Sequence, residues 1–505
     1  FGSRHAGLVR GPAPLRPGAM WVGCAIGLAL RYLLYVAGAG EYLEEHLEVN
    51  SPITSHSRLK EGFFLLESGS SPYAGDTCHH PPLLLLLLSP LRDAPALVHL
   101  ALVAAVDVAT ALLLRQMAVQ YAAARAKAGR PWAEASRKPT PQGESGSVSY
   151  AVTAVSGTLE DVVSPAFVGL SYLMSPFTVA SSIALSLQNV QHLATCAALC
   201  MAGAGRGGFC AGAVALALYV CPWTPVVLIP CCAYLCYAQK NPQAAEDHGY
   251  SRSNEGVIIE PGFVWYLFRF VVAVALLFGF LMAGSLVAMA GEAHFVQASF
   301  LSVLTVRDLT PNVGIFWYIF ILIFDRYRTL FLFAYHAQLL FFPVAMLTRV
   351  ARHRPTGPFL YCAMAVGSMS LHKPYPTASD YSLMITVLLI QAELIQEVEK
   401  SFAFLMSGLL FGLIMFPTMT SVWLSRNAGN ANFAYNMCLV VQVFGGLLLS
   451  ERLRAGMKVR RRMHLMSYCR GLVLGAVAAA VDGAGAGGQD APSVPGGGAA
   501  GGSGA

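Results

Sequence analysis

The sequence predicts an all-α fold, a polytopic membrane helical bundle of about twelve spans. Of its 505 residues, 55% are hydrophobic and only 12% are charged, whereas about a quarter of the residues of a soluble domain are charged. Apolar runs of near-spanning length recur along the chain, and clusters of Lys and Arg occupy the loops between them. This distribution fits the positive-inside rule and argues against a nucleic-acid-binding surface.

We divide the chain into three regions. Residues 1–19 precede Met20 and carry scattered Arg residues, so we interpret them as an N-terminal extension outside the fold. Residues 20–455 form the multi-spanning membrane domain. Residues 456–505 form a cytosolic basic segment and then a Gly/Ala-rich tail, whose composition predicts disorder.

The first elements combine a short span with a polar insert. Residues 21–36 suffice for a short first span, and its basic flank places the N-terminus in the cytosol. In the insert, Leu59, Phe63 and Leu66 recur on one face of an amphipathic helix over residues 55–68, which would lie on the membrane surface. Residues 82–91 predict a re-entrant or interfacial helix that leads into a span at residues 97–114.

The remaining spans follow from apolar runs bounded by basic or proline-containing loops. We place them at residues 165–185, 193–204, 209–221, 223–238, 263–290, 329–348, 356–371, 381–392, 401–417 and 433–449, with a short aromatic segment at residues 314–324. Each of the short segments at residues 82–91 and 314–324 is counted together with the span that follows it as one crossing. With this count, the loops rich in Lys and Arg all fall on the cytosolic side, and both chain ends lie in the cytosol.

The cysteines give no indication of a metal or cofactor. Most of the twelve Cys residues fall inside apolar runs, where Cys usually behaves as a small buried hydrophobic residue. Cys78 stands beside His79 and His80, but two prolines follow directly and no further ligand is near. We therefore predict no metal site and no cofactor.

The same count of crossings places three polar turns on one side of the membrane, the non-cytosolic side. The first precedes an aromatic segment, and its Pro311 suits the first turn of a helix that begins there. The aromatic rings after it suit the bilayer interface, with the polar side chains facing water or lipid headgroups. The candidate binding residues of the three turns are Asp308, Asn312, Phe316 and Trp317, then Lys373 and Tyr375, and then Asn430 and Asn432.

A shared luminal cavity is one interpretation of these turns. Polar groups at membrane depth are costly and usually line a cavity or a pathway. One carboxylate, one ammonium group, several amides and many aromatic rings would suit a glycan-phosphate headgroup above acyl chains. Each turn also has a structural interpretation, as an interfacial loop before a capped helix, a snorkelling Lys373, or asparagine helix caps. The residues alone leave both interpretations open.

These turns belong to a set of motifs that resembles the PIG-U family, membrane subunits of the GPI transamidase complex of the endoplasmic reticulum. The resemblance covers most of the chain, from Glu44 to Arg454. Its motifs are Glu48-Val-Asn-Ser-Pro52, the run from Glu61 to Gly75 followed by Pro82-Leu83, Asp308-Leu-Thr-Pro-Asn-Val-Gly-Ile-Phe-Trp-Tyr318, Lys373-Pro-Tyr-Pro-Thr377 with Asp380, and Asn430-Ala-Asn-Phe433. The sequence departs from the family in its Gly/Ala-rich ends, at residues 203–208 and at Pro374.

The resemblance implies a non-catalytic subunit that binds the GPI lipid, the attachment-signal peptide, or both, in the endoplasmic reticulum membrane. Its partners would be other transamidase subunits, including a caspase-like cysteine protease subunit. The family also looks like the GT-C mannosyltransferases, which implies a GT-C-like fold. Those enzymes carry Asp-x-Asp in the first luminal loop, but the corresponding stretch here is Ile53-Thr54-Ser55, without a carboxylate. We therefore predict no catalytic residue.

Two alternatives of other classes stay open. An active GT-C type glycosyltransferase with a dolichol-phosphate sugar donor would use Glu48 or Asp308 as base, and mannosyl transfer lost in Glu48→Gln would favour it. A transporter would line a pathway with the polar turns, and inverted repeats would favour it. The two short-plus-long patterns, at residues 82–114 and 314–348, share one topology instead.

Overall fold

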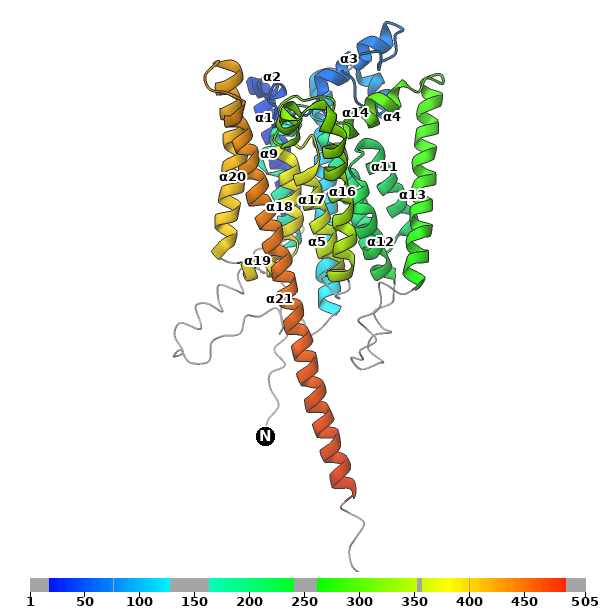
Figure 1. Cartoon of the computed structure of the whole chain (residues 1–505), viewed down its shortest axis with the longest axis vertical. Helices are drawn as coiled ribbons and strands as arrows, with labels where there is room; N and C mark the ends of the chain where they lie inside the picture. The colour runs from blue at the N-terminus through cyan, green and yellow to red at the C-terminus, as the bar shows by residue number, and fades with distance from the viewer. Residues whose placement is uncertain are drawn as a thin grey trace, which may run out of the picture.

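The computed structural model describes residues 18–75, 77–127, 163–239, 261–351, 357–398 and 400–486. Within these ranges the chain consists of helices, turns and loops and contains no strand. The predicted all-α class is therefore confirmed. The long helices stand side by side in one bundle, and short helices cap both of its ends (Figure 1).

Most helices run along the axis of the bundle. They are α1 (Gly18–Leu34), α5 (Ala96–Lys127), α8 (Pro165–Leu173) with α9 (Pro176–Ile183), α10 (Gln188–Gly203), α11 (Gly207–Val220), α12 (Pro225–Gln239), α13 (Pro261–Ala288), α16 (Asp325–Arg349), α17 (Gly357–His372), α18 (Ala378–Leu389), α20 (Lys400–Thr420) and α21 (Ala431–Ala486).

Short elements connect them at the two ends. They are η1 (Tyr35–Ala39), α2 (Gly40–Glu44), α3 (His56–Glu67), α4 (Pro82–Leu88), η2 (Ser89–Leu91), η5 (Val296–Leu301), α14 (Ser302–Leu304), α15 (Phe316–Leu322), α19 (Ala392–Val398) and η6 (Ser421–Ser425). We call the end that carries α3 the α3 end, and the opposite end the α19 end; they lie at the top and bottom of Figure 1.

Six helices in the described ranges are long and apolar enough to cross a membrane, or eight spans if two bent pairs each count as one. The bent pairs are α8 with α9, at 47°, and α18 with α19, at 95°. Four more axial helices, α10, α11, α12 and α17, occupy predicted spans but have only 16, 14, 15 and 16 residues. A perpendicular span needs ~20 residues, so the count of twelve crossings stays a prediction.

Position in the bundle accounts for these short helices. Every residue of α17 from Gly357 to Leu371 is buried, whereas only 11% of the spanning window of α16 is buried. Irregular backbone is tolerated at membrane depth when protein surrounds it. An inner helix can therefore end below the bilayer surface, while an outer helix has to match the thickness of the lipid.

The short elements confirm two predictions and correct a third. The amphipathic helix predicted over residues 55–68 is α3, and the short helix predicted over residues 82–91 is α4 with η2. The helix predicted to begin at Pro311 is wrong, because α15 begins only at Phe316. Instead, the Asn312 side chain accepts a hydrogen bond of 2.8 Å from the Gly314 N–H, and this local turn competes with helix formation.

The last helix is longer than the span predicted at residues 433–449. Helix α21 continues through the predicted basic segment to Ala486 and extends beyond the bundle at the α19 end (Figure 1). Residues 1–17 of the predicted N-terminal extension lie outside the described residues, as do residues 487–505 of the predicted tail. The proposed division of the chain therefore stays a prediction.

Candidate functional site

The three sequence-predicted turns meet at the α3 end. The Tyr375 hydroxyl donates a hydrogen bond of 3.0 Å to the backbone carbonyl of Asp308. Gly314 lies so close to Pro376 that an added Cβ would stand 2.8 Å from the proline Cδ. The hydroxyl of Tyr318 donates to the side-chain oxygen of Asn432. Segments that are far apart in the sequence thus form one contact region.

Asp308 is the carboxylate of this region. Its Oδ2 lies 2.8 Å from the Arg58 guanidinium of α3, and the two side chains retain 20% and 24% of their exposure. Its Oδ1 accepts hydrogen bonds from the backbone N–H and the hydroxyl of Thr310, at 2.9 and 2.5 Å. Burial raises the pKa of Asp308, but the hydrogen bonds from Thr310 and the charge of Arg58 outweigh it, so the pKa lies below its usual value. The carboxylate is charged at neutral pH.

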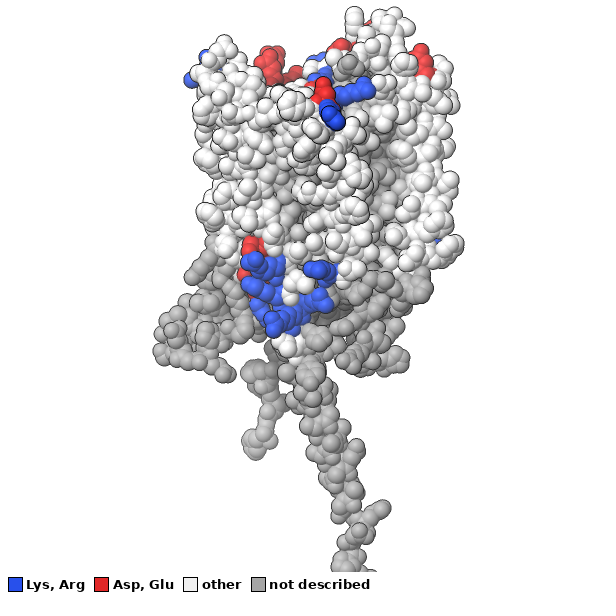
Figure 2. Space-filling model, in the orientation of Figure 1, with Lys and Arg blue, Asp and Glu red and all other residues white. Residues whose placement is uncertain are grey.

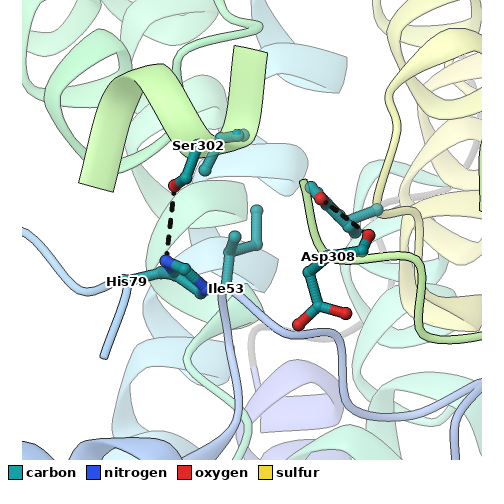
Figure 3. Close-up of a pocket in the computed structure, with 6 residues that line it drawn as sticks. Ile53, His79, Ser302 and Asp308 are labelled. Atoms are coloured by element: carbon teal, nitrogen blue, oxygen red, sulfur yellow. Dashed lines mark hydrogen bonds between the residues drawn. The ribbon is translucent and has the colours of Figure 1, made fainter. Parts of the chain in front are cut away.

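A small cavity lies beside Asp308. Its walls are formed by Ile53, His79, Ser302, Val303, Asp308 and Tyr375. In Figure 3, Ile53 lies between His79 and Asp308, and the Ser302 hydroxyl faces the His79 ring at 3.4 Å. The cavity has a volume of about 10 Å³, which is room for about one water molecule. The cavity is therefore too small to enclose a lipid headgroup.

Lys373 does not reach this cavity. Its side chain has 0% exposure, and its ammonium lies 2.6 Å from Oδ1 of Asp380. The same ammonium donates to Oε1 of Gln188 and of Gln191 on α10, at 3.3 and 3.4 Å. The ring of His192 approaches Asp380 at 3.3 Å. Because these partners surround the charge, Lys373 is not a snorkelling side chain, and its ammonium is held by groups of the protein itself.

Three other predicted residues are also buried. Asn312, predicted to face water or headgroups, has 1% exposure, and its amide donates to the Thr310 carbonyl. Phe316 and Trp317, predicted at the bilayer interface, have 2% and 1% exposure. Trp317 stacks on Trp423 of η6 at 6.1 Å between ring centroids. Their predicted exposure is wrong, because side chains of α16, η6 and α21 pack on these residues.

Asn430 and Asn432 are exposed at the start of α21. The Asn430 side chain accepts a hydrogen bond of 3.0 Å from the Asn432 N–H, so it satisfies one of the free N–H groups at the helix start. Tyr318 beside Asn432 stacks on Tyr435 with 4.3 Å between ring centroids. Exposed amide groups thus lie next to aromatic rings at the α3 end.

Sequence reasoning missed several partners. Arg58 stands on the polar face of a surface helix, and nothing local indicates that it pairs with Asp308. The α10 residues Gln188, Gln191 and His192 did carry a signal, because polar residues within an apolar run usually face partners inside a bundle. The same signal marks Arg31 of α1, whose guanidinium lies 3.0 Å from the Asp107 carboxylate of α5.

No group of three or more His, Cys, Asp or Glu residues in the described ranges is arranged to hold a metal ion. Near Cys78, the His79 ring contacts the Ala298 carbonyl at 2.7 Å, and the His80 ring contacts the Ser55 carbonyl at 3.0 Å. Burial lowers the pKa of His80 to about 4 and raises the pKa of Cys78 to about 11. These side chains tie the loop after α3 to η5 and to the start of α3.

The chain is similar to known proteins over most of its length. The family model described as GPI transamidase subunit PIG-U matches residues 25–441. The GPI-anchor transamidase component PIGU of Homo sapiens is 24% identical over 426 residues, which cover 84% of this chain and 91% of that protein. The Cricetulus griseus component is 25% identical over 428 residues, with the same shares. The GPI transamidase component GAB1 of Saccharomyces cerevisiae is 23% identical over 424 residues, 83% of this chain and 89% of that protein.

Proposed function

The chain belongs to the PIG-U family of GPI transamidase subunits, and we propose that it is a non-catalytic subunit of that complex which binds the GPI lipid, the attachment-signal peptide, or both. The observation that carries the proposal is the family match, which spans most of the membrane domain and all three polar turns. The partners are then the other subunits, including a caspase-like cysteine protease subunit. The membrane is that of the endoplasmic reticulum.

The α3 end is the side on which we propose that binding occurs. With the α3 end in the lumen, the helix ends that flank the loops predicted to be cytosolic, those of α5, α12 and α16, lie at the α19 end, as does the C-terminal end of α21 (Figure 1). This orientation requires about twelve crossings, with α10, α11, α12 and α17 each crossing once inside the bundle. Parity supports it, because an even number of crossings returns the chain to its starting side.

The polar and aromatic groups of the α3 end support a lipid headgroup as ligand. Asp308 and Arg58 form a partly exposed pair, which can exchange its internal contact for the ammonium and the phosphate of an ethanolamine-phosphate group. Asn430, Asn432 and Tyr318 supply amide and aromatic groups of the kind that contact sugar rings. Lys373 and Asn312, both buried, would act by holding the turns in place.

The glycosyltransferase alternative gains no support from a particular observation. The Asp308 carboxylate is held by Arg58 and Thr310, and Glu48 contacts the His46 ring at 2.9 Å. The cavity beside Asp308 is too small for a sugar acceptor, because it admits about one water molecule.

The test uses Asp308→Asn, which removes one charge and keeps the size of the side chain. In cells that depend on this chain for GPI attachment, we expect the surface display of GPI-anchored proteins to fall severalfold. Expression and co-purification with the other transamidase subunits should stay unchanged, because the partly exposed pair contributes little to stability.

Asp93→Asn is the matched control, since Asp93 lies at the same end with 85% of its side chain exposed. We expect normal display in the control. Normal display in Asp308→Asn would remove this carboxylate from the binding site. A chain that purifies alone and transfers sugar from a dolichol-phosphate donor would instead support the glycosyltransferase.

A further inference from the structure

One face of α21 changes from apolar to basic as it leaves the bundle at the α19 end. A helix turns by about 100° per residue, so positions that differ by four, seven or eleven lie on one stripe. The exposed stripe consists of Val443, Leu447, Ser450, Arg454, Lys458 and Arg461. Val443 and Leu447 are 56% and 46% exposed, and the Arg454 side chain is 65% exposed.

The opposite face of the same stretch packs on the bundle. Leu448, Ala455 and Val459 are buried, and the fully buried Arg452 donates to the carbonyls of Leu388 and Gln391 at the end of α18. The helix is therefore fixed in rotation over this stretch. The stripe from Val443 to Arg461 points outward, away from α17 and α19.

The basic part of the stripe lies within a larger cationic surface. Lys and Arg side chains collect at the lower end of the face seen in Figure 2. Arg349 ends α16, and Arg460 donates to its backbone carbonyl at 3.4 Å. The acidic neighbours are Glu451, which pairs with Arg454 at 2.7 Å, and Glu397, which pairs with Arg462. Arg349, Arg460 and Arg462 thus lie near the three basic residues of the stripe, Arg454, Lys458 and Arg461.

We propose that this stripe is a binding site for an anionic phospholipid, beyond the proposed role at the α3 end. Val443 and Leu447 would contact an acyl chain. Arg454, Lys458 and Arg461 would contact the phosphate and carboxylate groups of the headgroup. The order along the helix favours a lipid over a soluble acidic partner, because the apolar and basic positions follow each other on one face, as tail and headgroup do in a leaflet.

The test measures lipid binding to the full chain, purified in a neutral detergent and titrated with dioleoyl phosphatidylserine or dioleoyl phosphatidylcholine under native mass spectrometry. We expect phosphatidylserine to bind about tenfold more tightly than phosphatidylcholine, given the attraction of clustered Lys and Arg for anionic headgroups. The triple variant Arg454→Gln/Lys458→Gln/Arg461→Gln should lose this preference. A preference retained by that variant would overturn the proposal.

A matched triple variant, Arg92→Gln/Arg326→Gln/Arg426→Gln, removes three exposed cations from the α3 end and should keep the preference. If this control lost the preference for phosphatidylserine equally, the preference would reflect net charge, and the proposal would be overturned. Two competitors distinguish a lipid from other possible occupants of the site. They are glycerophosphoserine, which lacks acyl chains, and a polyglutamate peptide. Competition by either one as effective as that of the lipid would also overturn the proposal.

A further measurement needs no variant and so does not depend on folding of the triple substitution. When lipid binding to the unmodified chain is measured at a higher salt concentration, phosphatidylserine binding should weaken more than phosphatidylcholine binding, because salt screens exposed charges. Equal salt dependence of the two lipids would contradict a basic headgroup site.

Discussion

Two acid–base pairs at the α3 end differ in their burial. Arg58 and Asp308 lie 2.8 Å apart and retain 24% and 20% of their side-chain exposure. Lys373 and Asp380 lie 2.6 Å apart and retain 0% and 1%. Both pairs involve polar turns that the sequence predicts on one side of the membrane. The difference teaches that a charge in such a turn is not by itself a ligand contact.

The energetic roles of the two pairs should differ accordingly. A partly exposed pair contributes about 0–1 kcal/mol, so a ligand can replace one partner at little cost. A buried pair is strongly destabilised when one partner is removed, because the other charge remains in a medium of low polarity. The first pair suits binding, and the second suits the rigid placement of the turn that carries Tyr375.

The largest effect is expected from Lys373→Met. The substitution leaves Asp380 charged or forces it to take up a proton, with a loss of about 3–5 kcal/mol. We expect most of the chain to disappear from the properly folded fraction. Fluorescence-detected size-exclusion chromatography and thermal melting in detergent would measure this loss.

A second substitution tests the cause of that loss. In Lys373→Met/Asp380→Asn, both charges are gone, and the asparagine can still accept the hydrogen bond that the Thr377 N–H donates to Asp380. We expect the double variant to recover much of the lost stability. A single variant that melts at the normal temperature would contradict the structural role of the buried pair.

A smaller effect is expected from Arg58→Gln. The free energy of unfolding should fall by at most about 1 kcal/mol, because both side chains are partly exposed and Thr310 still holds Asp308. The Asp308 carboxylate remains, so display of GPI-anchored proteins should fall less than in Asp308→Asn. Melting and surface display of both variants would check this order. A loss of stability as large as that of Lys373→Met would erase the distinction between the pairs.

Much of the fold could be predicted from the sequence, because lipid as solvent demands long apolar helices with their backbone groups satisfied internally. The positions of most helices follow from apolar runs, and parity predicts that the three turns lie at the same end of the bundle. The lengths of α10 and α17 do not, because they depend on which helices lie inside the bundle.

The environment of the candidate residues was harder to predict. An aromatic ring such as Trp317 suits the bilayer interface and the protein interior equally well, and stacking on Trp423 decides between them. Lys373 meets Gln188 and Gln191 only because α10 passes beside the turn. Long-range packing sets these contacts, and no local pattern encodes it.

The smallest effect concerns a third acid–base contact at the α3 end, between His46 and Glu48 at 2.9 Å. The hydrogen bond that the protonated His46 ring donates to the Glu48 carboxylate raises the pKa of His46 above its usual 6.5, despite partial burial. A raised folded-state pKa means that the contact stabilises the chain fully below pH 6.5 and that this stabilisation is lost as the pH rises through the folded-state pKa. The contribution of this contact to stability should therefore fall by at most about 1 kcal/mol between pH 6 and pH 8. It opposes the rise in stability that His56 and His80 give over the same range, because burial lowers their pKa values.

His46→Gln should remove that part of the pH dependence, whereas His294→Gln, at an exposed histidine of the same end, should leave it in place. Because the Asp308 pKa lies below its usual value, its pair with Arg58 persists throughout this range and loses stabilisation only when the solution is made strongly acidic. A pH dependence unchanged in His46→Gln would mean that His46 and Glu48 are not coupled. The contrast would then rest on the Arg58–Asp308 and Lys373–Asp380 pairs alone, which differ in burial.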